Sequence, residues 1–239
     1  MTNSDTFDDF DAAVRAFWAG RDLQTQKQVE SGTVDAGARG AVTGGKHLAP
    51  LEAVVAGLFA PLQALGAEVK SGARLTLPGY YRRSKDWDLL VTYNDTLVAA
   101  IEFKSQVGSI GNNFNNRTEE ALGNAVDIWK GYEEGTFGRV RPWLGFVFVI
   151  EHSQVSSRTS VRDPETLFRS DPIFAQTSYI DRYQILAQRL VRERLYDATL
   201  LLTTRQGEGI YNEPVPEVSV ANFAAAIAGR IAYIEALNL

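Results

Sequence analysis

The sequence has no cysteine, only two histidines and a single methionine among its 239 residues. The absence of cysteine excludes disulfides, thiolate metal sites and cysteine nucleophiles. With only His47 and His152, the chain has few residues from which to build a histidine metal centre or a Ser-His-Asp relay. Chemistry therefore falls mainly to carboxylates, lysines and arginines.

Positive charge is also in short supply. The chain has 24 Lys and Arg against 29 Asp and Glu, a formal net charge of −5, which argues against a generic polycation. Hydrophobic residues at 45%, charged residues at 22% and only 8 prolines are typical of an ordinary globular protein. A chain of this length can bury one sizeable core, and we expect a single domain over 1–239.

A targeting segment and a membrane span are not indicated. The first ten residues are acidic and lack both a basic start and an apolar core, unlike a signal peptide. The most apolar stretch, 48–67, carries Glu52, Gln63 and two prolines, which favours an amphipathic helix. We expect a soluble cytoplasmic protein with no membrane association.

The hydrophobic periodicity predicts an α/β fold, a central mixed sheet flanked by helices, with helical additions at both ends. We divide the chain into an N-terminal helix and Gly-rich connector (1–46), a core (47–151) and a C-terminal loop, helix, strand and helix (152–239). The expected helices run from about 7 to 27, 48 to 66 with a kink at Pro61, 117 to 133, 178 to 196 and 219 to 236. The expected strands run from about 68 to 78, 86 to 93, 97 to 105, 141 to 151 and 198 to 204.

Two neighbouring strands place acidic and basic side chains where they can meet. Glu102 and Lys104 project from the same face of their strand because side chains alternate with a period of two. Asp88, on the preceding strand, joins them only if the hairpin register pairs it with Glu102. A two-residue loop at 94–95 would place Asp88 opposite Ile101, on the other face. A shared site therefore requires an odd-length loop or a bulge.

Asp88 and Glu102 would repel each other unless they share a hard cation such as Mg²⁺. Such a cation withdraws charge from a bound phosphate and acidifies water, which Lys104 can position, so the pattern suits phosphodiester hydrolysis. A Glu-x-Lys triplet arises by chance about once in a chain of this size, and a second occurs at 68–70. The triplet alone therefore also fits a surface ion pair, and it is the acidic partner one strand back that favours a metal site.

Three runs surround these residues: WDLLV at 87–91, AAIEFKSQVGS at 99–109 and GNNFNNRTEEALG at 111–123. Together they resemble type II restriction endonucleases of the XhoI family, within the PD-(D/E)xK nuclease superfamily. The resemblance implies a Mg²⁺-dependent homodimer that cuts both strands of the palindrome CTCGAG and leaves 5′-phosphates. It also implies a cognate DNA methyltransferase as functional partner.

The resemblance assigns roles by motif position. Asp88 and Glu102 would be catalytic metal ligands, the Phe103 carbonyl would supply a further oxygen, and Lys104 would activate water.

The sequence departs from the superfamily pattern because Trp87, not proline, precedes Asp88. Asp86 shares a face with Asp88 and is an alternative ligand, although Asp88 directly adjoins the apolar strand. Glu52 is a candidate auxiliary carboxylate; the alternative is a solvated helix residue.

Contacts with double-stranded DNA must come from local clusters, since phosphate contacts usually supply most of the non-specific affinity. The cluster 80–85 combines two aromatic residues with three cations, and the expected loop 111–117 packs four Asn and one Arg, which pair well with adenine and guanine edges. The loop 151–163 could also hold Arg158 and Arg162 against DNA. The alternatives are a solvated turn for 80–85, ordinary turn chemistry for 111–117 and a plain surface loop for 151–163. The residues predicted to contact DNA are Tyr80, Arg82, Arg83, Lys85, Ser105, Gln106, Asn112, Asn113, Asn115, Asn116, Arg117, Arg158 and Arg162.

Three other functions remain open from the residues: a catalytically silent DNA-binding module of the same fold, a nuclease for repair or branched DNA, and a metal-independent structural or protein-binding domain. Intact Asp88, Glu102 and Lys104 argue against the silent module, which has no physical need to keep repelling carboxylates together. A palindromic site cut in both strands is most simply met by a two-fold dimer. The N-terminal and closing helices are the candidate dimer surfaces.

Overall fold

The computed structural model describes residues 3–30, 47–108, 110–159 and 167–237. The strands are β1 (Glu68–Pro78), β2 (Ser84–Tyr93), β3 (Thr96–Gln106), β4 (Trp143–Glu151), β5 (Ala198–Thr204) and β6 (Tyr211–Asn212). The α-helices are α1 (Asn3–Glu30), α3 (Ala49–Gly57), α4 (Ala60–Ala64), α5 (Ile110–Glu133), α6 (Gln154–Ser157), α7 (Tyr179–Arg192) and α8 (Val220–Leu237). The short 3-10 helices are η2 (Pro172–Phe174) and η3 (Pro216–Val218). The Gly-rich connector expected within 31–46 lies outside the described residues.

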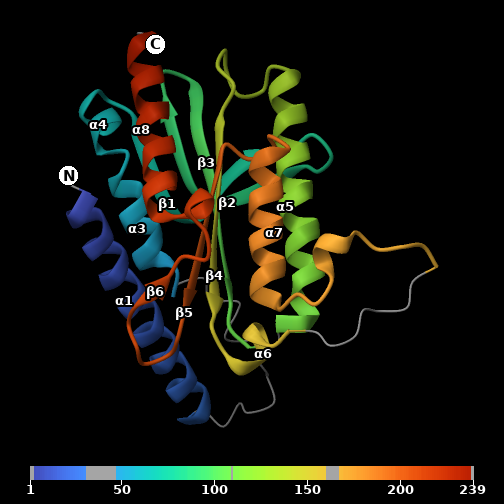
Figure 1. The fold of residues 1–239 in the computed structure, drawn as a ribbon. Helices are drawn as coiled ribbons and strands as arrows, with labels where there is room; N and C mark the ends of the chain where they lie inside the picture. The colour runs from blue at the N-terminus through green and yellow to red at the C-terminus, as the bar shows by residue number, and fades with distance from the viewer. Residues whose placement is uncertain (1–2, 31–46, 109, 160–166, 238–239) are drawn as a thin grey trace.

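The strands form one mixed sheet in the order β1-β2-β3-β4-β5-β6. β1, β2 and β3 are antiparallel neighbours, β3-β4 and β4-β5 are parallel, and β6 is antiparallel to β5. Helices α1, α3, α4 and α8 cover one face, and α5 and α7 cover the other (Figure 1). The predicted α/β class with a central mixed sheet is confirmed.

The helix α1 packs through the stripe that the sequence shows. Phe10, Val14, Phe17 and Trp18 recur at helical spacing and are all buried against the sheet core. The helix extends to Glu30, three residues beyond the expected end.

The apolar stretch 48–66 forms two helices and not one helix kinked at Pro61. α3 ends at Gly57 and α4 begins at Ala60, so Pro61 lies in the first turn of α4. A proline is tolerated there because the first-turn N–H groups have no intrahelical partner. The helix is therefore interrupted just before the proline.

The helix α5 begins seven residues earlier than expected, so the prediction of a loop at 111–117 is wrong. The Asn-rich segment forms the first two turns of the helix. Ile110 is buried, and the Phe114 ring lies 5.1 Å from the ring of Tyr183 on α7. These two apolar contacts extend the buried stripe of the helix and outweigh the preference of Asn for turns.

The β2-β3 hairpin has the register that a shared site requires. Asn94 and Asp95 both have positive φ, which makes a two-residue type I′ turn. The pairing changes from Thr92↔Leu97 to Val91↔Ala99, so Val98 is the extra residue of a β-bulge.

Beyond the bulge, Leu90 lies opposite Ala100 and Leu89 lies opposite Ile101, which brings Asp88 to the level of Glu102. Of the two predicted alternatives, an odd-length loop or a bulge, the structure has the bulge. The guanidinium of Arg230, buried on α8, holds it by donating to the Val98 carbonyl at 3.1 Å and to the Arg141 carbonyl at 3.0 Å.

By length and composition alone, α8 is the one helix of the described ranges that could cross a membrane. A helix of a globular core meets the same criteria. One face of α8 packs on the sheet through Phe223, Ile227, Ile231 and Ile234.

Candidate functional site

The strands β2 and β3 bring together the carboxylates and the lysine singled out in the sequence. The Phe103 N–H donates to the Asp88 carboxylate at 2.7 Å, which fixes Asp88 against β3. The Lys104 ammonium lies 2.5 Å from Glu102 Oε1. Glu102 is only 3% exposed, so its charge acts in a poorly hydrated environment.

Asp86 does not compete for the position of Asp88. It is exposed and accepts a hydrogen bond from the Thr76 hydroxyl on β1, on the far side of β2 from β3. The geometry therefore favours Asp88 as the partner of Glu102.

Glu52 belongs to the same electrostatic cluster. It lies on α3 and is 7% exposed, which contradicts the alternative of a solvated helix residue. Burial, and then the charge of Asp88, raise the pKa of Glu52 to about 7. Burial and then the Glu102 carboxylate likewise raise the pKa of Asp88 to about 6. The hydrogen bond from the Phe103 N–H and the ammoniums of Lys104 and Lys85 lower this pKa, but by less.

Lys104 is a charged ammonium at neutral pH. Burial lowers its pKa, but the carboxylates of Glu102, Asp88 and Glu120 outweigh burial, and the net shift is upward. Lys104 can therefore donate hydrogen bonds to a water, a hydroxide or a phosphate oxygen, and it is not a neutral base.

A divalent cation fits the oxygen donors of this site. Among the described residues, no group of three His, Asp or Glu side chains is close enough together to hold a metal ion, so the acidic ligands would be the pair Asp88 and Glu102. The carbonyl of Phe103 points to the same edge of β3 as its N–H, which already meets Asp88. Two carboxylates and a carbonyl, completed by waters, are the ligands that Mg²⁺ prefers.

Lys85, predicted from the sequence to contact DNA, also belongs to this site. Its ammonium lies 2.6 Å from Glu102 Oε2 and 4.6 Å from the centre of the Trp87 ring, and its side chain is 12% exposed. The cation run in the sequence indicated a surface cluster, and nothing local indicated that Lys85 turns inward to Glu102.

The neighbouring segment 79–83 is fastened to α5 by Asp127. One carboxylate oxygen of Asp127 accepts from the N–H groups of Tyr80 and Tyr81, and the other accepts from Arg82 Nε. Arg82 also donates to Asn124. Its guanidinium thus already has partners within the chain, which the sequence could not indicate because Asp127 lies 45 residues away.

Ser105 and Gln106, which follow Lys104, do not form an open contact surface. The Ser105 hydroxyl lies 2.9 Å from Nε2 of His47. The pKa of His47 is lowered to about 4 by burial and, to a smaller extent, by the charge of Arg21. Gln106 is 4% exposed and donates to the Gly108 carbonyl, so its predicted contact with DNA is not supported in this state.

The remaining predicted DNA contacts lie on or near the surface. On α5, Asn115 and Asn116 are exposed, Asn113 is half-buried, and Arg117 donates to Glu120 at 2.6 Å. Arg83 and Tyr80 are exposed before β2, and Arg158 is exposed just after α6. The Asn112 side chain and Arg162 lie outside the described residues.

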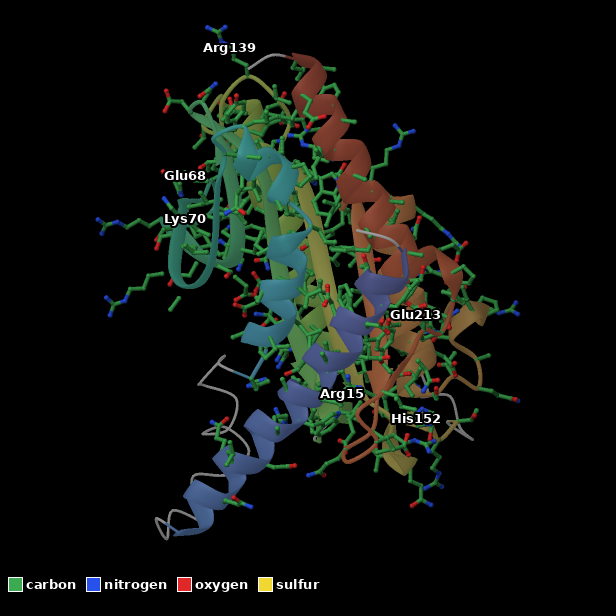
Figure 2. The ribbon with its side chains drawn as sticks, turned by 90° about the vertical axis from the view of Figure 1, so that its left-hand side faces the viewer. Arg15, Glu68, Lys70, Arg139, His152 and Glu213 are labelled. Carbon is green, nitrogen blue, oxygen red and sulfur yellow. The ribbon has the colours of Figure 1, made fainter. Side chains whose placement is uncertain are left out.

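The second Glu-x-Lys triplet is a surface ion pair. Glu68 and Lys70 lie 2.5 Å apart on β1, both more than half exposed, at the outer edge of the sheet (Figure 2). The triplet without an acidic partner on a neighbouring strand is therefore the one that forms a surface ion pair.

The raised pKa values of Glu52 and Asp88 predict that these two groups make the cation-free protein less stable as the pH rises. The folded state holds their protons more tightly than the unfolded state does, so their contribution to stability is lost between about pH 4 and pH 7, while the lowered pKa of His47 acts in the opposite direction. Over this range in EDTA, we expect the Tm of Glu52→Gln to rise relative to the Tm of wild type. Equal slopes for wild type and Glu52→Gln, from thermal melts followed by circular dichroism, would refute this origin.

The chain is similar in sequence to type II restriction enzymes. It matches the family model described as restriction endonuclease XhoI over residues 27–213. It is 39% identical over 213 residues to the type II restriction enzyme BstVI of Geobacillus stearothermophilus, covering 85% of this chain and 95% of that protein. It is 47% identical over 149 residues to the type II restriction enzyme AbrI of Azospirillum brasilense, covering 61% of this chain and 67% of that protein.

A third relative, the type II restriction enzyme XhoI of Xanthomonas vasicola, is 40% identical over 182 residues, which cover 74% of this chain and 72% of that protein. No solved structure matches the chain significantly.

Proposed function

This chain belongs to the XhoI restriction endonuclease family and is a type II restriction endonuclease, and from that premise we propose that it cuts both strands of double-stranded DNA at CTCGAG. We propose Mg²⁺ as the cofactor and 5′-phosphates as the new ends. The observation that carries the chemistry is the meeting of Asp88, Glu102 and Lys104 across the bulged hairpin.

Each residue has a role that its environment supports. Asp88 and Glu102, with the Phe103 carbonyl, would hold the cation, which supplies Lewis acidity and acidifies a bound water. The Phe103 N–H keeps Asp88 oriented, and the Lys104 ammonium holds the attacking water and the negative charge that develops on it. Glu52, buried in the same cluster, holds a proton up to about pH 7 and would add negative charge at this place when that proton is released on cation binding.

DNA would approach the side of the sheet that α5 covers. Arg83 is exposed just before β2, in the segment that Asp127 holds against the second half of α5, and Asn115 and Asn116 are exposed nearer the start of that helix. These side chains offer donors to phosphates and bases. The exposed Arg83 would supply local positive charge for DNA binding in a protein of net charge −5.

Arg82 and Arg83 are a matched pair with different roles. We expect Arg83→Ala to weaken DNA binding and to reduce its salt dependence by about one counterion, with stability unchanged. Arg82→Ala should instead lower the free energy of unfolding by about 2 kcal/mol because the buried Asp127 loses its charged partner. Fluorescence anisotropy at several salt concentrations in Ca²⁺, and urea unfolding, measure the two effects. Similar results for the two variants would refute this distinction.

A palindromic site is best served by a two-fold homodimer, each subunit treating one half-site. We also propose that the protein works in the cytoplasm beside a DNA methyltransferase that protects host sites. Light scattering during gel filtration tests the dimer directly.

The deciding experiment uses a plasmid with one CTCGAG site, purified protein, and Mg²⁺ or EDTA. Linearisation at that site in Mg²⁺ alone supports the proposal. Mg²⁺-dependent cutting elsewhere would discard CTCGAG, and cutting of branched DNA alone would favour a repair nuclease. A folded protein that binds DNA without cutting it would favour the silent module.

A further inference from the structure

The Glu102 carboxylate is held by two lysines, one on each oxygen. Oε1 lies 2.5 Å from the Lys104 ammonium, and Oε2 lies 2.6 Å from the Lys85 ammonium. The proposed function needs Lys104 but assigns nothing to Lys85. Two ammoniums on one carboxylate that is 3% exposed give this part of the site an excess of positive charge that an ordinary ion pair lacks.

Lys85 is directed to this place by more than Glu102. Its ammonium also donates to the Asp86 carbonyl at 2.9 Å and lies over the buried Trp87 ring. It comes from the same strand as Asp88, and its charge opposes the upward shift of the Asp88 pKa. The charge of Lys85 thus acts on both carboxylates of the site, through the ion pair with Glu102 and at longer range on Asp88.

A divalent cation shared by Asp88 and Glu102 would need the oxygen that Lys85 now holds. Oε1 is already occupied by Lys104, the ammonium that the reaction requires, which leaves Oε2 as the oxygen for the cation. The cation and the Lys85 ammonium are both positive, so their repulsion disfavours an arrangement with both at Oε2.

We propose that Lys85 is a positioning residue that holds Glu102 Oε2 in the cation-free enzyme and is exchanged for the divalent cation when the cation binds. This inference rests on the proposed function and adds to it a built-in competitor for the metal. Before the cation binds, the charge of Lys85 offsets the repulsion between the carboxylates of Asp88 and Glu102. The same charge weakens the affinity of the site for the cation.

The test measures cation binding without DNA and without turnover. Mn²⁺ is titrated into the purified protein, and the free ion is followed by electron paramagnetic resonance. We expect Lys85→Met to bind Mn²⁺ at least about tenfold more tightly than wild type because a unit positive charge beside the ion is removed. Lys85→Arg, which keeps the charge, should stay close to wild type.

Lys70→Met is the matched control because Lys70 pairs with Glu68 on the exposed edge of the sheet. It should leave the Mn²⁺ affinity unchanged. Lys85→Met should also reach its half-maximal cutting rate at a lower Mg²⁺ concentration than wild type, a shift that a simple loss of stability would not produce. Lys85→Gln serves as a second variant if Lys85→Met does not fold, as judged by circular dichroism.

Equal or weaker Mn²⁺ binding by folded Lys85→Met, with wild-type binding that Glu102→Gln abolishes, would overturn the role of Lys85 and leave the proposed metal site intact. Wild-type protein that binds no Mn²⁺, or binds it equally well in Glu102→Gln, would overturn the metal site and this inference with it.

Discussion

Glu102→Gln is expected to lower the rate of DNA cleavage by roughly a thousandfold or more. The amide keeps the shape of the side chain but removes the charge that faces Lys104, Lys85 and the proposed cation. Two partly buried ammoniums then lose their shared partner, so cation binding and the position of Lys104 both suffer. Single-turnover cleavage of a short duplex with one site measures the effect.

Glu68→Gln is the control for this change. It alters the same kind of Glu-x-Lys triplet, but on the exposed edge of β1, and should leave the rate within about twofold of wild type. Cleavage by Glu102→Gln at a rate close to that of Glu68→Gln would contradict a catalytic role for the β3 triplet.

Arg230→Met is expected to lower the free energy of unfolding by about 3 kcal/mol. The Arg230 guanidinium is buried and supplies the hydrogen bonds of the Val98 and Arg141 carbonyls, which methionine cannot replace. Because Val98 is the bulged residue, we expect the cutting rate to fall as well at temperatures where the variant is folded. Urea unfolding at about 25 °C measures the first effect.

Arg205→Met provides the comparison, since Arg205 is exposed and its guanidinium pairs with Glu208 at 3.4 Å on the surface. It should change stability by less than about 0.5 kcal/mol. An Arg230→Met variant as stable as Arg205→Met would show that the bulge does not depend on the guanidinium.

The central strands and the acidic pair could be predicted because their signals are local. β3 and β4 read as continuous apolar runs, as expected of strands buried on both faces. The shared face of Glu102 and Lys104 follows from alternation along one strand, and the requirement for an odd-length loop or a bulge follows from counting residues around one turn.

The contacts that escaped prediction join distant parts of the chain. The start of α5 depends on Phe114 meeting Tyr183, and the role of Arg82 depends on Asp127 in another element. Lys85 has the sequence context of a surface cluster, and only the fold brings Glu102 beside it. Composition and periodicity carry no information on such pairings, because each one is decided by how the helices pack on the sheet.

The bulge at Val98 decides whether residues that face each other across the hairpin are an even or an odd number of positions apart, and this separation can be read from a sequence. A regular two-residue turn places residues with an odd separation opposite each other, and one bulge converts that separation to even, as it is between Asp88 and Glu102. A natural relative can therefore lengthen the hairpin by one residue on each arm and keep its site, but a single insertion moves the acid to the opposite face. An odd spacing between the two acids of a relative would indicate that its hairpin had lost the bulge or that another side chain had become the ligand.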